Sequence, residues 1–234
     1  MIAERIAAVR ERVLRAAARA GRRRDEITLI AVSKTFPAAA VREAFAAGLR
    51  DFGENKVQEA DGKLGSLPDL RAQGARFHLV GHLQGNKARR AVQLFDLIHS
   101  VDSLELGRRL AQQAAEATTI AHVLVQVDLV GEVTKFGLDE AQLFPTLTAL
   151  RAFKALRVMG LMILPPYDED PEKSRSYFRR LRELRDRARA EDLMPGSELS
   201  MGMSHDLEGA IEEGATLVRV GTAIFGERTR PPAA

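Results

Sequence analysis

The sequence predicts a single α/β domain folded as a (β/α)8 TIM barrel, with an extra helix at the N-terminus. Two observations support this prediction. Short apolar segments alternate strictly with amphipathic helical patterns along the 234 residues, and eight strand-helix units can be counted. Strict alternation is typical of parallel strands joined by right-handed crossovers, and eight units are the number that closes a barrel. An open doubly wound sheet is the alternative, and the number of strands favours the barrel.

The first element is an amphipathic helix over 4–20. Apolar residues recur there at helical spacing between arginines and glutamates, namely Ile6, Val9, Val13 and Leu14. A glycine directly after this pattern is a typical helix stop. Because this helix precedes the first strand, we expect it to pack outside the barrel.

The strands and helices then follow in alternation. The segments that read as strands are 27–32, 50–53, 77–80, 97–101, 121–128, 157–162, 198–201 and 217–220. The clearest helices fall at 37–47, 86–94, 103–117, 140–153, 172–191 and 205–214. Several begin with Ser, Asn, Asp or Pro and end at Gly, as helix caps require. No linker composition interrupts this order, so we expect one domain over 1–234 with a frayed tail at 230–234.

Composition argues against several classes of protein. The net charge of +3 is spread over amphipathic segments, without the basic stripe and interleaved aromatics of a nucleic-acid surface. The arginine-rich stretch 175–189 also carries a helical stripe of apolar residues that we expect to pack on the barrel. Cysteine is absent, which excludes disulfides and thiolate chemistry. No apolar run approaches the roughly 20 residues that span a bilayer, and no signal-peptide core opens the chain, so we expect a cytoplasmic protein.

A lysine stands at the carboxyl end of the first predicted strand. Lys34 follows the apolar run 27–32, at the place where α/β proteins hold their functional groups. The chain has seven lysines against twenty-eight arginines, so a lysine in this position is notable. A desolvated lysine can lose its proton and attack a carbonyl, which arginine cannot do.

Other strand ends carry polar residues and glycines that would meet Lys34 at one rim. The last two loops suggest a phosphate site, because Ser204 would cap the helix expected at 205–214 and Gly221 and Thr222 would open a short helical turn. Helix starts offer backbone N–H groups to an anion. The simpler alternative is that Ser204 is only an N-cap and Gly221 only a turn glycine. The expected position of Lys34 across the barrel mouth favours a phosphate site over this simpler alternative.

An amine, a phosphate site and a slot with methionines suit pyridoxal phosphate. Lys34 would hold its aldehyde as a Schiff base and the last two loops its phosphate. Arg219, on the last strand, would then face the pyridine nitrogen and keep it unprotonated, since a guanidinium cannot accept a proton. The alternative for Arg219 is a buried ion pair with Asp206 or Glu227.

With these residues in place, the chain resembles the pyridoxal phosphate homeostasis protein family, single-domain relatives of the alanine racemase barrel. The segments that carry the resemblance are 31–35, 52–59, 78–87, 160–162, 199–206 and 219–226. The resemblance implies Lys34 as the Schiff-base lysine, Arg219 at the pyridine nitrogen, and a phosphate site of Ser204, Gly221 and Thr222. It also implies Asn55 and Met201 near the ring.

The resemblance implies a carrier or regulator of vitamin B6 without established turnover. Its partners would be pyridoxal phosphate and PLP-dependent apoenzymes as recipients, and we expect a monomer. The alternative is a small amino-acid racemase that uses Lys34 and a second base from Tyr167, His82 or His205. A metal hydrolase built on His78 and His82 is a weaker alternative, because four residues across a strand end do not place both rings on one face. We expect His78 inside the barrel and His82 at its mouth.

Overall fold

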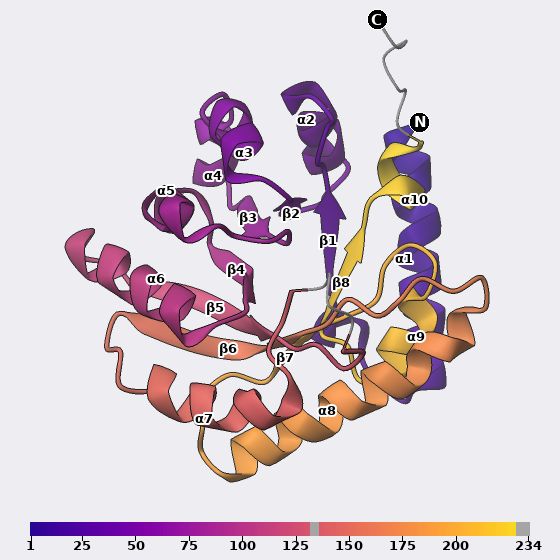
Figure 1. Ribbon diagram of the computed structural model, residues 1–234. Helices are drawn as coiled ribbons and strands as arrows, with labels where there is room; N and C mark the ends of the chain where they lie inside the picture. Colours follow the sequence, from indigo (N-terminus) through magenta and orange to yellow (C-terminus); the bar gives the residue numbers. More distant parts are fainter. Residues whose placement is uncertain (132–135, 228–234) are drawn as a thin grey trace, which may run out of the picture.

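A computed structural model describes residues 1–131 and 136–227 of the chain. The predicted fraying of the tail 230–234 lies outside the described residues. Eight parallel strands close into a barrel in chain order (Figure 1). They are β1 (Thr28–Val32), β2 (Asp51–Glu54), β3 (Arg76–Leu79), β4 (Leu97–Val101), β5 (Ala121–Gln126), β6 (Leu156–Met162), β7 (Glu198–Ser200) and β8 (Leu217–Val220). The predicted (β/α)8 barrel is confirmed, and β1 pairs with both β2 and β8 to close it.

Helices surround the barrel, as Figure 1 shows. They are α2 (Ala38–Ala46), α3 (Val57–Leu64), α4 (Pro68–Ala72), α5 (Ala88–Leu94), α6 (Leu104–Glu116), α7 (Glu140–Leu150), α8 (Arg175–Ala190), α9 (Leu207–Glu212) and α10 (Thr222–Phe225). Short 3-10 turns lie at Arg24–Glu26, Gly85–Lys87 and Pro171–Ser174. Two helices begin as their sequence predicts: Ser103 accepts a hydrogen bond from the N–H of Leu106, and Asp139 from that of Gln142. No helix of the described residues is both long and apolar enough to cross a membrane.

The N-terminal helix α1 (Ile2–Arg19) packs outside the barrel, against α2, α9 and α10. Its buried face contains Ile6, Val9 and Val13, as predicted, together with two alanines one turn further on. The assignment of Leu14 to this face was wrong, because half of that residue is exposed to solvent. Consecutive helical residues point about 100° apart, so Leu14 cannot share the direction of Val13.

The arginine-rich helix α8 also packs through one face. Phe178, Leu181 and Leu184 are buried there, and the arginines of the same helix reach carboxylates on its outer side. Arg180, for example, pairs with Glu140 of α7 at 2.6 Å. The apolar stripe of this segment is therefore a packing face, as expected.

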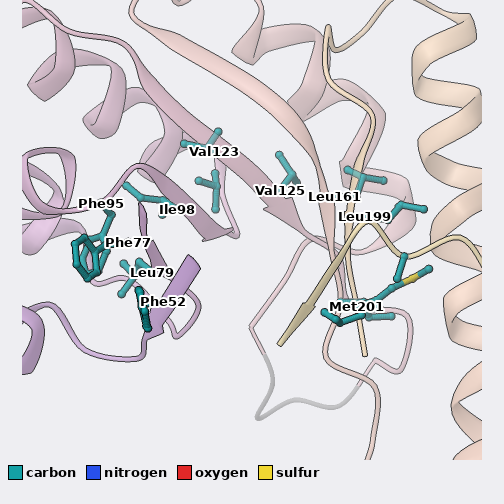
Figure 2. Packing of buried hydrophobic residues seen from close by; sticks show 14 of the residues in the cluster. Phe52, Phe77, Leu79, Phe95, Ile98, Val123, Val125, Leu161, Leu199 and Met201 are labelled. Carbon is teal, nitrogen blue, oxygen red and sulfur yellow. The ribbon is translucent and has the colours of Figure 1, made fainter. Parts of the chain in front are cut away.

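The strands alternate between two buried layers. Side chains that point outward pack between the strands and the helices; Figure 2 shows part of this layer, with Phe52, Phe77, Leu79, Ile98, Val123, Val125, Leu161, Leu199 and Met201. Side chains that point inward form a separate small cluster, Ile30, Leu124, Met162 and Leu217. Because strand side chains alternate with a period of two, the neighbours of outward residues fill the barrel interior.

The interior of the barrel is partly polar. His78, His99, Ser200 and Arg219 lie between outward-facing neighbours on β3, β4, β7 and β8, and all four are buried. The prediction that His78 points into the barrel is confirmed. These polar side chains lead from the interior to the carboxyl ends of the strands, where the candidate site lies.

Candidate functional site

A cavity of about 650 Å³ opens at the carboxyl ends of the strands. Its walls contain six of the seven site residues predicted from the sequence: Lys34, Asn55, Ser204, Arg219, Gly221 and Thr222. Arg219 lies on β8, and the others lie directly after β1, β2, β7 and β8, so barrel closure brings them together. The remaining wall is largely apolar, with Val32, Phe36, Val80, Leu164 and Met203 among its residues.

Met201 is the predicted site residue that the cavity does not include. It is fully buried in the layer between strands and helices (Figure 2). Ser200 points inward, so the next residue points outward, and Met203 rather than Met201 reaches the cavity wall. Strand alternation thus separates Met201 from the other six residues.

The turn that carries Lys34 has an uncommon backbone. Thr35 has φ of 67°, in the left-handed region that β-branched residues rarely adopt. Strain of this kind persists only where the surroundings hold it in place. Here a carboxylate of Glu59 accepts a hydrogen bond from the Thr35 N–H. Lys34 itself is half-buried at the cavity wall.

A buried ion pair supports the same turn from behind. The Lys63 ammonium on α3 donates to the carbonyl of Ser33 at 2.7 Å and to Oε1 of Glu54 at 2.7 Å. The Ser33 hydroxyl donates to the same Glu54 oxygen at 2.6 Å. Burial raises the pKa of Glu54, and the Lys63 ammonium and these hydrogen bonds offset this only in part. The second oxygen, Oε2, is buried without a hydrogen-bond partner in the part of the chain that the structure describes.

Arg219 presents a buried guanidinium to the cavity. Its Nη1 donates to Oγ of Ser200 at 2.5 Å and its Nη2 to the carbonyl of Ile163 at 2.9 Å. Burial lowers the pKa of Arg219 to about 10, against a smaller opposing effect of Asp206, so the group stays charged at neutral pH. Within residues 1–131 and 136–227 it forms no ion pair, so neither alternative carboxylate neutralises it.

The predicted phosphate residues gather at one end of the cavity. The Oγ of Ser204 accepts a hydrogen bond from the N–H of Ala223 at 3.4 Å, which connects the loop after β7 to the start of α10. The expectation that Ser204 caps the following helix was wrong: α9 begins at Leu207, and Asp206 is its N-cap residue. Since capping does not explain Ser204, its hydroxyl remains a candidate ligand of an anion in the cavity.

The second-base candidates also line the cavity. His82 lies at the mouth as predicted, with Nδ1 3.1 Å from Asp102 and its ring stacked on Phe136 at a centroid separation of 3.5 Å. Tyr167 and His205 also line the cavity, with ring centroids 5.5 Å apart. Burial raises the pKa of Asp102, an effect that the neighbouring His82 partly counters.

The two histidines of the metal alternative point to different places. His78 lies inside the barrel, bonded to Asp51 and His99, whereas His82 lies at the mouth. Among the described residues no group of three potential ligands could hold a metal ion. His99 and Lys63 were not predicted from the sequence as residues that support the site. Their signals were a histidine inside an apolar strand and a lysine on the apolar-facing side of a helix.

Comparison with known proteins identifies the family. The sequence profile of the alanine racemase N-terminal domain matches residues 5–229. The pyridoxal phosphate homeostasis protein of Pseudomonas aeruginosa is 46% identical over 97% of this chain and 96% of its own length. The protein of the same name from Aquifex aeolicus is 43% identical over 96% and 97%. The chain belongs to the pyridoxal phosphate homeostasis protein family.

Solved structures agree with this family assignment. PipY of Synechococcus elongatus, solved without PLP, has a TM-score of 0.87 at 41% identity, covering 97% of this chain and all of its own. The PLP-bound structure of PipY has a TM-score of 0.85. Alanine racemase of Streptomyces coelicolor shares the fold, with a TM-score of 0.70 at 22% identity, but the chain covers only 58% of it.

Proposed function

We propose that this protein binds pyridoxal 5'-phosphate and serves its homeostasis in the cell, as a single domain over 1–234. The observation that carries the proposal is the meeting of Lys34, Arg219 and the Ser204–Thr222 loops around one cavity. An amine, a buried cation and hydroxyl groups at helix starts are the donors that an aldehyde, a pyridine nitrogen and a phosphate require. The names of the family's members and the PLP-bound PipY structure support the same ligand.

Different residues of the cavity would bind different parts of the cofactor. Lys34 would hold it covalently, with its Nζ bonded to the former aldehyde carbon and one water released. Ser204, Gly221 and Thr222 would bind the phosphate, and Asn55 would lie beside the ring. When bound, pyridoxal phosphate supplies an electron sink for amino-acid chemistry. Arg219 donates and cannot accept a proton, so it keeps the pyridine nitrogen unprotonated and weakens that sink.

Carriage of the cofactor, rather than turnover, is the role we propose. The relatives carry the name of homeostasis proteins, and the placement of Arg219 disfavours carbanion chemistry. Recipients would be PLP-dependent apoenzymes, in the cytoplasm, with the protein acting as a monomer. Size-exclusion chromatography tests the oligomeric state, and transfer of bound cofactor to an apoenzyme in the presence of a trapping enzyme tests delivery.

Reductive labelling tests the assignment of Lys34. Borohydride treatment of the PLP-loaded protein should fix a pyridoxyl group on Lys34, as identified by peptide mapping. Lys34→Ala should remove the label, whereas the control Lys56→Ala, a lysine outside this cavity, should retain it. Pyridoxal should bind much more weakly than its phosphate ester if Ser204 and Thr222 hold the phosphate. Label on another lysine, or equal affinity for the two ligands, contradicts the assignment.

A racemase is the second candidate, because Tyr167, His82 and His205 line the same cavity as Lys34. The decisive measurement is interconversion of L- and D-alanine by the PLP-loaded protein and by Lys34→Ala. Trace exchange is compatible with a carrier, because a lysine can abstract a proton slowly. Lysine-dependent turnover of roughly 1 per second or faster would establish the racemase instead.

A further inference from the structure

A continuous chain of hydrogen bonds crosses the barrel interior and ends at Arg219. Oδ1 of Asp51 lies 3.0 Å from Nε2 of His78, and Nδ1 of His78 lies 3.0 Å from Nε2 of His99. Nδ1 of His99 lies 2.8 Å from Oγ of Ser200, which accepts from Nη1 of Arg219 at 2.5 Å. The five residues come from β2, β3, β4, β7 and β8, and each is buried.

The two ends of this hydrogen-bond chain indicate the direction in which hydrogen bonds are donated along it. An arginine can only donate, and an ionised carboxylate can only accept. Ser200 must therefore accept from Arg219, and its single proton is then available for Nδ1 of His99. Where Nδ1 of His99 accepts that proton, His99 carries its own proton on Nε2 and donates to Nδ1 of His78, whose Nε2–H then donates to Asp51.

The charges around the chain agree with this direction. Asp51 also accepts a hydrogen bond at Oδ2 from Nη2 of Arg76, 2.9 Å away, at the outer end of this hydrogen-bond chain. Although burial opposes it, the hydrogen bonds from His78 and Arg76 hold the pKa of Asp51 below its usual value. Burial lowers the pKa of His99 well below 6.5, so that ring is neutral at physiological pH.

We propose that Ser200, His99 and His78 are positioning residues that orient the Arg219 guanidinium toward the pyridine nitrogen of the bound cofactor. This inference rests on the proposed function. Arg219 donates one hydrogen bond to Ser200 and one to the carbonyl of Ile163, which leaves its other N–H groups available to a ligand in the cavity that it lines. Each acceptor in the chain is itself a donor to the next residue, which prevents the serine hydroxyl from rotating toward the guanidinium.

A purely structural role is the competing explanation, since any buried polar group needs a partner. The two roles differ in what they do to the ligand. A structural role affects the whole cavity, whereas a positioning role affects the pyridine nitrogen alone. A carbocyclic analogue of pyridoxal phosphate, with C–H in place of the ring nitrogen, separates them because it cannot accept from Arg219.

The test compares the two ligands in His99→Phe and Ser200→Ala, with His122→Phe as the control. His122 is an exposed histidine of β5 that takes no part in the hydrogen-bond chain from Asp51 to Arg219. We expect both chain variants to weaken pyridoxal phosphate binding about tenfold, the scale of one hydrogen bond to a charged group, and to leave the analogue's affinity unchanged. Equal loss for both ligands, or no loss for either, overturns the positioning role.

Nitrogen-15 NMR of the histidine rings tests the chain without any cofactor. The protein before loading should show His78 and His99 as neutral Nε2–H tautomers, and Ser200→Ala should shift the Nδ1 resonance of His99. A doubly protonated His78, or an Nδ1–H tautomer of His99, would reverse the chain and refute the proposal. This readout is independent of Lys34, so a failure of the proposed function and a failure of the chain give different results.

Discussion

Replacing Lys63 by methionine should destabilise the protein strongly at neutral pH. The side chain of Lys63 is 7% exposed and that of its partner Glu54 is 1% exposed, so this is a buried ion pair and not a surface one. Methionine has a similar length and no charge, so it would leave the buried Glu54 carboxylate without its counter-charge. The Oε2 atom of that carboxylate has no hydrogen-bond partner among residues 1–131 and 136–227. Removal of one partner of a buried pair costs about 3–5 kcal/mol, a large fraction of the stability of a typical domain.

The loss of unfolding free energy caused by Lys63→Met should depend on pH in a defined direction. Burial raises the pKa of Glu54 above its ordinary 4.5, and the loss of Lys63 raises it further. The folded variant then binds a proton that the unfolded chain releases above pH 4.5. The cost is therefore small near pH 4.5 and grows as pH rises toward the folded pKa, by up to about 1.4 kcal/mol per pH unit.

Urea unfolding at pH 5 and pH 8 measures this effect. Lys63→Met combined with Glu54→Gln should recover most of the stability at pH 8, because no charge is then left unpaired. Lys173→Met is the matched control: its pair with Asp168 is exposed, so its loss should leave the free energy of unfolding nearly unchanged. A cost of Lys63→Met below about 1 kcal/mol at pH 8, or one that does not change with pH, would refute the reasoning.

Three further predictions concern the pH response, the cavity and the N-terminal helix. Burial keeps His99 neutral in the folded state, whereas the unfolded chain protonates this residue below about pH 6.5. The free energy of unfolding should therefore decrease as the pH falls below 6.5, by up to about 1.4 kcal/mol per pH unit, and His99→Gln should flatten this slope in urea titrations. Gly81→Ala should weaken pyridoxal phosphate binding measured by absorbance, because a Cβ at that position would lie 2.3 Å from the carbonyl of Asn55 and displace the cavity wall; unchanged affinity contradicts this. Val13→Ala should cost about 2 kcal/mol in unfolding and Leu14→Ala less than about 0.5 kcal/mol, and equal costs would contradict the observed face of α1.

Much of the architecture could be predicted from local pattern. Alternating strand and helix signals gave the eight units, and the position of Lys34 after the first strand placed an amine at the rim. These predictions succeeded because the spacing of apolar residues and the position of a strand end can both be recognised within a short segment of the sequence. The same holds for Ser204, Gly221 and Thr222, which follow strands that any barrel would bring to one rim.

The failures share a different cause. Strands of a parallel barrel are buried on both faces, so their sequence is apolar throughout and does not mark which side faces inward. Met201 was therefore assigned to the cavity although it faces the helices, and the inward direction of His99 was not recognised. Lys63 was missed because its partner, Glu54, is nine residues away and meets it only across the barrel-helix interface.

The sequence by itself thus determined the number, order and type of elements and the residues that follow each strand. The inward direction of His78 was predicted, but only the tertiary structure decided which other strand residues point inward, and with them the path from Asp51 to Arg219. The physical reason is that the path joins five strands far apart in the chain, and their side chains become neighbours only when β8 pairs with β1. Such contacts depend on closure of the whole barrel, which no local segment specifies.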